Sequence, residues 1–196
     1  IMDAIKTLLV SSVCSEKHWK YERALATTTC PAKARKHADF RIDTGKRIRA
    51  KASNVHERVK ALLGKSVPVV ACFAVAWDNK EARKSGKIEV VYDPATNKPA
   101  KSKSGHSMLI VGYDDEEEHY ILKNSWGTSW GDSGYGYMSY EYFDEYGYST
   151  WFAPEAVVQP KSVAPTELFS ENQADDDFFF IPQTTSELWH SVYRLN

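Results

Sequence analysis

The stretch between residues 105 and 136 constrains the fold more than any other part of this 196-residue chain. It contains two apolar runs separated by five consecutive acidic residues, and then a segment rich in glycine and tryptophan. The apolar runs predict strands over 107–113 and 119–123, and the acidic residues 114–118 predict a solvated turn between them. With a third strand predicted over 134–139, we expect this stretch to form an antiparallel sheet.

Two polar residues, His106 and Asn124, lie at the ends of the first two predicted strands, so a hairpin would bring them to one end of the sheet. An imidazole can take the proton of a thiol and keep the sulfur nucleophilic as an ion pair. The ring must then protonate a leaving amine, so it has to be held in one orientation, which an amide oxygen can do. An indole from Trp126 over this hydrogen bond would exclude water, and Gly105 would let a substrate backbone approach. Histidine and asparagine are common on neighbouring strands, so the surrounding residues make this pair distinctive.

The strings GHSMLIVGYD and YILKNSWGTSWGDSGYGYM resemble the histidine and asparagine regions of the papain-like cysteine peptidases. The resemblance is strongest over residues 105–142 and extends more weakly over about 3–153. It implies an α+β fold, mainly the antiparallel β-barrel lobe plus part of the helical lobe, with His106 as catalytic base and Asn124 as the orienting residue. Four residues are expected to bind or shield substrate: Gly105, Ser107, Trp126 and Trp130.

The sequence departs from this family at the nucleophile. The family's cysteine lies in a C-G-[SA]-C-[WY] segment about 130–150 residues before the histidine. Cys14 and Cys30 lie much closer to His106 than that, and neither is followed by an aromatic residue or preceded by glycines. The glutamine that donates to the oxyanion in this family precedes the nucleophile and has no counterpart here. We therefore expect the isolated chain to hydrolyse peptides negligibly.

Three functions remain compatible with these residues. In the first, the chain supplies the base to a cysteine peptidase whose nucleophile lies on a missing or separate N-terminal segment, so its partners would be a peptide or protein substrate and a second polypeptide. In the second, it is an inactive pseudoenzyme that serves as a binding or scaffold subunit in a larger assembly. In the third, an acyl-transfer site is rearranged around Cys14 or Cys30. The intact His106, Asn124 and Trp126 favour the first function, since a scaffold has no chemical need for them.

Composition and residue spacing bear on the other possible ligands of the chain, which are nucleic acid, membrane and metal. A net charge of −1 gives no field that attracts nucleic acid, and no segment is apolar enough over a sufficient length to span a membrane. The histidines and cysteines lack the spacing of a metal site, and the acidic run 114–118 lacks the alternating ligands of a calcium loop, so we expect no metal and no cofactor. Cys14 and Cys30 are either bridged or free, and Cys72 is expected to be a core thiol within a strand. Localisation stays open, although the resemblance is weakly in favour of a secreted, lysosomal or vacuolar protein.

The remaining segments predict the organisation of the chain. We expect helices over about 3–11 and from Asn54 to Gly64, and strands over 67–77 and 88–92, with charged loops at 78–87 and 97–105. Residues 1–153 are expected to form the papain-like part. The segment 154–196, rich in proline, serine and acidic residues, is expected to be a tail or docking segment. Residue 1 is not methionine, so we expect a truncated or processed end there.

A last expectation concerns the surface of the chain. In the family, the barrel lobe buries one face against the helix that carries the nucleophile. Without that helix, the face would expose apolar side chains to water. We therefore expect the isolated chain to be oligomeric, bound to a partner or poorly stable.

Overall fold

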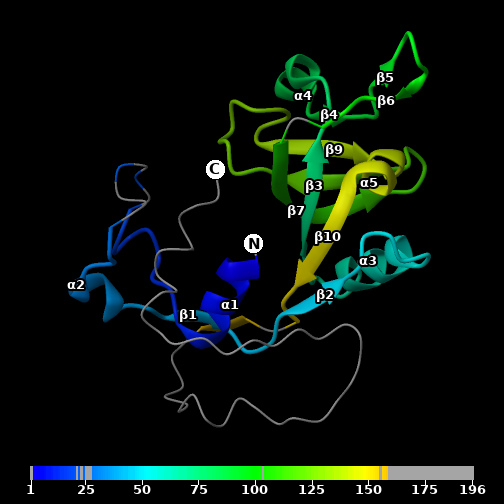
Figure 1. The fold of residues 1–196 in the computed structure, drawn as a ribbon. Coiled ribbons are helices and arrows are strands. Elements are labelled where there is room, and N and C mark those ends of the chain that lie inside the picture. The colour runs from blue at the N-terminus through cyan, green and yellow to red at the C-terminus, as the bar shows by residue number, and fades with distance from the viewer. Residues whose placement is uncertain are drawn as a thin grey trace. The chain divides into compact units, whose positions relative to one another are not determined.

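The fold was analysed in a computed structural model that describes residues 2–20, 22, 24, 28–102, 104–154 and 156–158 (Figure 1). These residues divide into two compact units. The first takes its described residues from 1–46 and 153–158, and the second spans 47–152. Within the described ranges, no helix has both the length and the apolar content to cross a lipid bilayer.

The first unit contains two helices and a small sheet. Helix α1 (Met2–Val10) confirms the helix predicted near the start of the chain, and α2 (Ala32–Arg35) is a single short turn after Pro31. Strand β1 (Phe40–Ile42) pairs antiparallel with β11 (Ala156–Val158). The segment 154–196, predicted to be a tail or docking segment, contributes this short strand, and its residues after 158 lie outside the described part of the chain.

The second unit is built on a seven-stranded sheet, in the order β2-β10-β3-β7-β8-β9-β4. Its long central strands are β3 (Val69–Val75), β7 (Ser104–Asp114), β8 (His119–Lys123) and β9 (Tyr135–Ser139), and neighbours among them pair antiparallel. The three predicted strands of the acidic hairpin region are confirmed within a few residues. The α+β class and its mainly antiparallel sheet are confirmed as well.

The edges of this sheet were not predicted. Strands β2 (Lys46–Ile48) and β10 (Gly147–Phe152) form one side, and β4 (Lys87–Ile88) pairs parallel with β9 on the other. The single strand predicted over 88–92 is wrong, because the chain leaves the sheet after Ile88 and forms a separate hairpin of β5 (Tyr92–Asp93) and β6 (Lys98–Pro99).

Three helices accompany the sheet. Helix α3 (Val55–Leu63) begins after Asn54 and ends at Gly64 as predicted, although the Asn54 side chain makes no capping hydrogen bond. The charged loop predicted over 78–87 is wrong, since α4 (Asn79–Ser85) lies there. Asp78 caps this helix by accepting from the Lys80 and Glu81 amides at 2.8 and 3.4 Å, and Gly86 ends it in the left-handed region at φ 79°.

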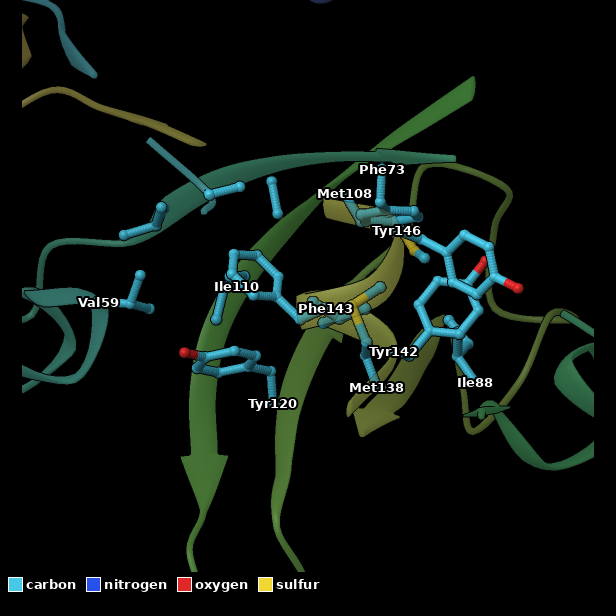
Figure 2. Close-up of a cluster of buried hydrophobic side chains, with 14 of the residues drawn as sticks. Val59, Phe73, Ile88, Met108, Ile110, Tyr120, Met138, Tyr142, Phe143 and Tyr146 are labelled. Carbon is cyan, nitrogen blue, oxygen red and sulfur yellow. The ribbon is translucent and has the colours of Figure 1, made fainter. Parts of the chain in front are cut away.

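Helix α5 (Tyr140–Tyr146) packs on β3, β9 and β10 and closes the core. Figure 2 shows the aromatic rings of α5 among aliphatic side chains from the sheet. The Tyr142 hydroxyl lies in this core and has both of its hydrogen-bonding roles filled, because it donates to Ala74 O at 2.7 Å and accepts from Ala76 N at 2.8 Å. These bonds tie α5 to the end of β3, where the chain approaches the candidate site.

Candidate active site

The β7–β8 hairpin brings the predicted histidine and asparagine together. His106 lies near the start of β7, opposite Phe73 of β3, and Asn124 follows the last residue of β8. The Asn124 amide donates to Gly134 O at 3.0 Å, which fixes the backbone where it leaves the sheet. At this end of the hairpin, His106 Nε2 lies 3.1 Å from Asn124 Oδ1.

This contact defines the protonation pattern of the ring. Asn124 Oδ1 also accepts from the Ser125 amide at 2.8 Å, which identifies it as the oxygen of the side-chain amide. An oxygen can only accept here, so Nε2 of His106 carries the hydrogen and Nδ1 of the neutral ring is left as an acceptor. Asn124 is 8% exposed, and its buried Nδ2 has no protein partner.

Burial controls the pKa of His106. Removal of the ring from water lowers this pKa, and the hydrogen bond to Asn124 opposes the effect only in part. The net shift is below the ordinary histidine value. The ring is therefore neutral at pH 7, which is the form that can take a proton from an acid.

Three aromatic side chains surround the His106 ring. Trp126 stacks on it with ring centroids 4.6 Å apart, and Phe73 and Trp77 meet it edge-on, each at 6.3 Å. Trp126 is itself 44% exposed, so it covers one side of the ring while its own outer side meets solvent. Sequence reasoning missed both Phe73 and Trp77. The β3–β7 register places Phe73 opposite His106, and Trp77 follows the end of β3 by two residues.

Trp130 packs against Trp126. It is 2% exposed, and its ring meets that of Trp126 edge-on at 5.8 Å. Gly136 leaves room for it, because a Cβ at that position would lie 2.8 Å from the Trp130 ring. Trp130 therefore packs against Trp126, and its predicted role toward a substrate stays a prediction.

The other two residues expected to bind substrate, Gly105 and Ser107, flank His106 on β7. Side chains alternate along a strand, so both lie on the opposite side of the sheet from His106. A Cβ at Gly105 would lie 3.0 Å from the Tyr148 hydroxyl, and Ser107 Oγ lies 3.5 Å from Cys72 Sγ. Their roles toward a substrate stay predictions.

Cys72 is the one cysteine in the unit that holds His106. It pairs with Ser107 in the β3–β7 register and therefore lies on the side of the sheet away from the His106 ring. It is 3% exposed, and burial raises the pKa of its thiol. The prediction of a core thiol is confirmed, and Cys72 does not offer its sulfur to His106.

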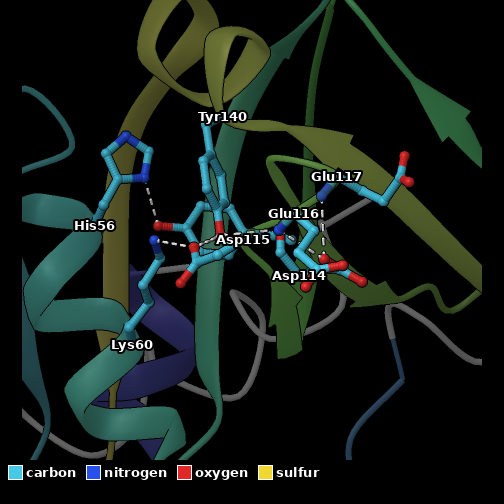
Figure 3. Close-up of polar contacts among 8 residues, drawn as sticks. His56, Lys60, Asp114, Asp115, Glu116, Glu117 and Tyr140 are labelled. Atoms are coloured by element: carbon cyan, nitrogen blue, oxygen red, sulfur yellow. Dashed lines mark hydrogen bonds and ion pairs between the residues drawn. The ribbon is translucent and has the colours of Figure 1, made fainter.

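The far end of the hairpin is fixed to α3 by polar contacts (Figure 3). The Lys60 ammonium pairs with Asp115, which also accepts from the Tyr140 hydroxyl at 2.8 Å. Nearby, the buried Tyr120 hydroxyl lies 2.7 Å from His56 Nδ1. The acidic turn is exposed as predicted, and Lys60 and Tyr140 hold it in place.

Comparisons with known proteins agree with this geometry. A family model described as papain family cysteine protease matches residues 1–152, which is most of the chain. This chain therefore belongs to the papain family of cysteine proteases.

Among the relatives, an uncharacterised peptidase C1-like protein of Acanthamoeba polyphaga mimivirus is 30% identical over 174 residues, covering 82% of this chain and 52% of the relative. Xylellain, a cysteine protease from Xylella fastidiosa, superimposes with a TM-score of 0.61 at 27% identity, over 76% of this chain and 59% of xylellain. Mouse cathepsin K is 47% identical over 36 residues, which is 17% of this chain. The chain thus spans about half the length of the mimivirus relative.

Proposed function

We propose that this chain is the base-bearing part of a cysteine peptidase, with His106 as the general base and Asn124 as the residue that orients its ring. The observation that carries the proposal is the 3.1 Å hydrogen bond between His106 Nε2 and Asn124 Oδ1, covered by Trp126. It leaves Nδ1 unprotonated on a neutral ring of lowered pKa. Such a nitrogen can accept the proton of a thiol.

The chemistry proposed for this site is acyl transfer from a peptide. His106 Nδ1 takes the proton of a cysteine thiol, and the thiolate attacks the carbonyl carbon of the scissile bond. His106 then gives the proton to the leaving amine as the C–N bond breaks and an acyl-enzyme forms. Water, deprotonated by the same ring, releases the acid product. Asn124 holds the ring in one orientation through each of these transfers.

The nucleophile in this proposal comes from a polypeptide segment outside the present sequence. Cys72 lies on the opposite side of the sheet from His106, so it does not supply the thiol. The family relationship and the coverage of about half of a relative both support a contribution from further sequence. The expected partners are a peptide or protein substrate and the segment that carries the cysteine.

A second candidate is an inactive papain-like subunit that binds other proteins. The position of Cys72 favours it, since the one thiol of the unit that holds His106 is buried on the other side of the sheet from that ring. The two candidates make opposite predictions for the protein in its natural setting, because only the first requires a reactive cysteine near His106.

The experiment is affinity purification of the chain from its natural source, followed by labelling with an epoxide that alkylates peptidase cysteines and by intact mass analysis. We expect a labelled cysteine on a segment continuous with this chain or tightly bound to it. Labelling should be lost in His106→Gln and kept in His119→Gln, a histidine at the other end of the hairpin. If the purified material contains this chain alone and takes up no label, the second candidate, an inactive subunit that binds other proteins, is correct.

A further inference from the structure

Helix α4 is tied by backbone hydrogen bonds to the segment 125–134, called the tryptophan loop below. The Gly131 amide in this loop donates to Arg83 O of α4 at 2.9 Å. The Tyr137 amide of β9, just after the loop, donates to Gly86 O at 2.8 Å, and β4 then runs parallel to β9. The last turn of α4 is therefore fixed against the loop and against the strand that follows it.

Three glycines let these backbones approach closely. A Cβ at Gly86 would lie 2.7 Å from Tyr135 O and 3.0 Å from Gly136 Cα. A Cβ at Gly131 would lie 3.1 Å from Gly86 Cα. Side chains at these positions would force the two segments apart, so glycine is needed for the contact. Because backbone meets backbone here, the position of α4 relative to the tryptophan loop does not depend on flexible side chains.

This contact places a cation over the indole of Trp126. The guanidinium carbon of Arg83 lies 6.0 Å from the centroid of the Trp126 ring. A guanidinium near the face of an indole is attracted by its π electrons, and its planar shape packs well on a ring. Among the described residues, no carboxylate forms an ion pair with Arg83, so no competing partner draws its charge away from the indole.

We propose that Arg83 is a positioning residue of the candidate active site, because its guanidinium holds Trp126 stacked on His106. The same indole lies 4.6 Å from the His106 ring, centroid to centroid, and Trp126 is 44% exposed. A side chain as exposed as this one has few neighbours to hold it, so a contact from α4 matters for its orientation. The inference adds a residue to the site and does not depend on the source of the nucleophile.

Arg83 is expected to act on His106 through the indole. Burial lowers the pKa of His106, the hydrogen bond to Asn124 opposes this, and Trp126 supplies part of the burial. Without Arg83, the indole should leave the stacked position part of the time and admit water to the imidazole ring. The imidazolium is then better solvated, so the pKa of His106 should rise toward its ordinary value of about 6.5.

The test measures the His106 signal by NMR in the folded 196-residue chain, with His106→Gln to assign it. At pH 8 the ring current of Trp126 shifts the Cε1–H signal of His106, and a titration gives the pKa. In Arg83→Met, a change at an exposed position, we expect part of the ring-current shift to be lost and the pKa to rise. Arg83→Lys should restore part of both, since an ammonium also binds the face of an indole. Lys84→Met, an equal loss of charge on the same helix, should change neither.

A double variant separates positioning from direct repulsion between the guanidinium and the imidazolium, since loss of that repulsion would also raise the pKa of His106. If Arg83 acts through Trp126, Arg83→Met should have no further effect on this pKa in a Trp126→Ala background. An equal rise in both backgrounds would show that the charge acts directly and would overturn the proposal. Wild-type values of the ring-current shift and the pKa in Arg83→Met, or the same changes in Lys84→Met, would also overturn it.

Discussion

His106 shows how neighbours determine the chemistry of one side chain. Phe73, Trp77 and Trp126 remove its ring from water and favour the neutral form, while Asn124 favours the charged form by accepting from Nε2. The desolvation effect is the larger of the two, so the pKa is lowered. A thiolate beside Nδ1 would act in the other direction and raise this pKa, since opposite charges stabilise each other.

The hydrogen bond that His106 donates to Asn124 can be tested by changing the charge of residue 124. Asn124→Ala removes the bond that favours imidazolium, so the pKa of His106 should fall further below its ordinary value. Asn124→Asp places a carboxylate at the same position and should raise it. NMR titration of the His106 Cε1–H signal measures both shifts. Asn54→Ala, whose side chain makes no capping bond, is the control and should leave the signal unchanged. Shifts of the same sign in both Asn124 variants would show that the bond does not act on His106.

The lowered pKa of His106 also makes stability depend on pH. In the unfolded chain this histidine titrates near its ordinary pKa of about 6.5, and in the folded chain it titrates lower. As the pH falls below about 6.5, the unfolded state therefore binds more protons, and the free energy of unfolding decreases until the pH passes the folded pKa. His106→Gln should remove this part of the loss, measured by urea unfolding between pH 8 and 5. An identical pH dependence in wild type and His106→Gln would rule out the lowered pKa.

At the scale of elements, side-chain contacts hold the β7–β8 hairpin at both of its ends. Lys60 and Tyr140 hold the acidic turn at one end, and the His106–Asn124 bond lies at the other. The segment after Asn124 then has to place Trp126 on His106 and Trp130 against Trp126. Two glycines in that segment, Gly127 and Gly131, have positive φ values of 83° and 58°.

These two glycines form a matched pair for mutation. Alanine at either position adopts a left-handed backbone, which costs about 1–2 kcal/mol. At Gly127 nothing lies within 4 Å of the new Cβ, so the cost should stay in that range. At Gly131 the Cβ would meet the Tyr135 carbonyl oxygen, so the free energy of unfolding should fall clearly further. Urea unfolding of both variants measures the difference, and equal losses would show that the loop relaxes freely around residue 131.

At the scale of the whole chain, the sheet of the second unit depends on strands far apart in sequence. Strand β10 lies between β2 and β3 in the sheet, although about 70 residues separate β3 from β10 along the chain. The described papain-like part therefore needs its last strands to complete the sheet. The docking role predicted for residues 154–196 stays a prediction, since most of that segment lies outside the described residues.

Two truncations separate these contributions. Ending the chain after residue 158 keeps β10 and β11 and should leave the thermal transition close to that of the full chain, if the tail does not pack on its own domain. Ending it after residue 146 removes β10 from between two neighbours and should abolish the cooperative transition. Circular dichroism during heating measures both. A large loss of stability after truncation at 158 would assign the tail to the folded core.

Much of the fold was readable because local patterns and tertiary structure agree. The apolar runs in 107–113 and 119–123 predicted the hairpin, and Asn54 and Gly64 marked the ends of α3. Helix α4 was missed because its seven residues have little apolar periodicity, although Asp78, Glu81 and Gly86 carried the signals of its ends. The edge strands β2 and β4 are short, and they are strands only because they pair with distant segments of the chain. No local sequence pattern predicts that pairing.

The sequence by itself determined the family, the hairpin and the residues His106, Asn124 and Trp126, because these depend on residue type and close spacing along the chain. Tertiary structure alone decided which side chains surround the ring and on which side of the sheet Cys72 lies. Phe73 reaches His106 through the β3–β7 register, which also turns Cys72 away from the ring, and Trp77 reaches it from just beyond the end of β3. Contacts of this kind arise from packing between segments far apart in sequence, so only the folded chain specifies them.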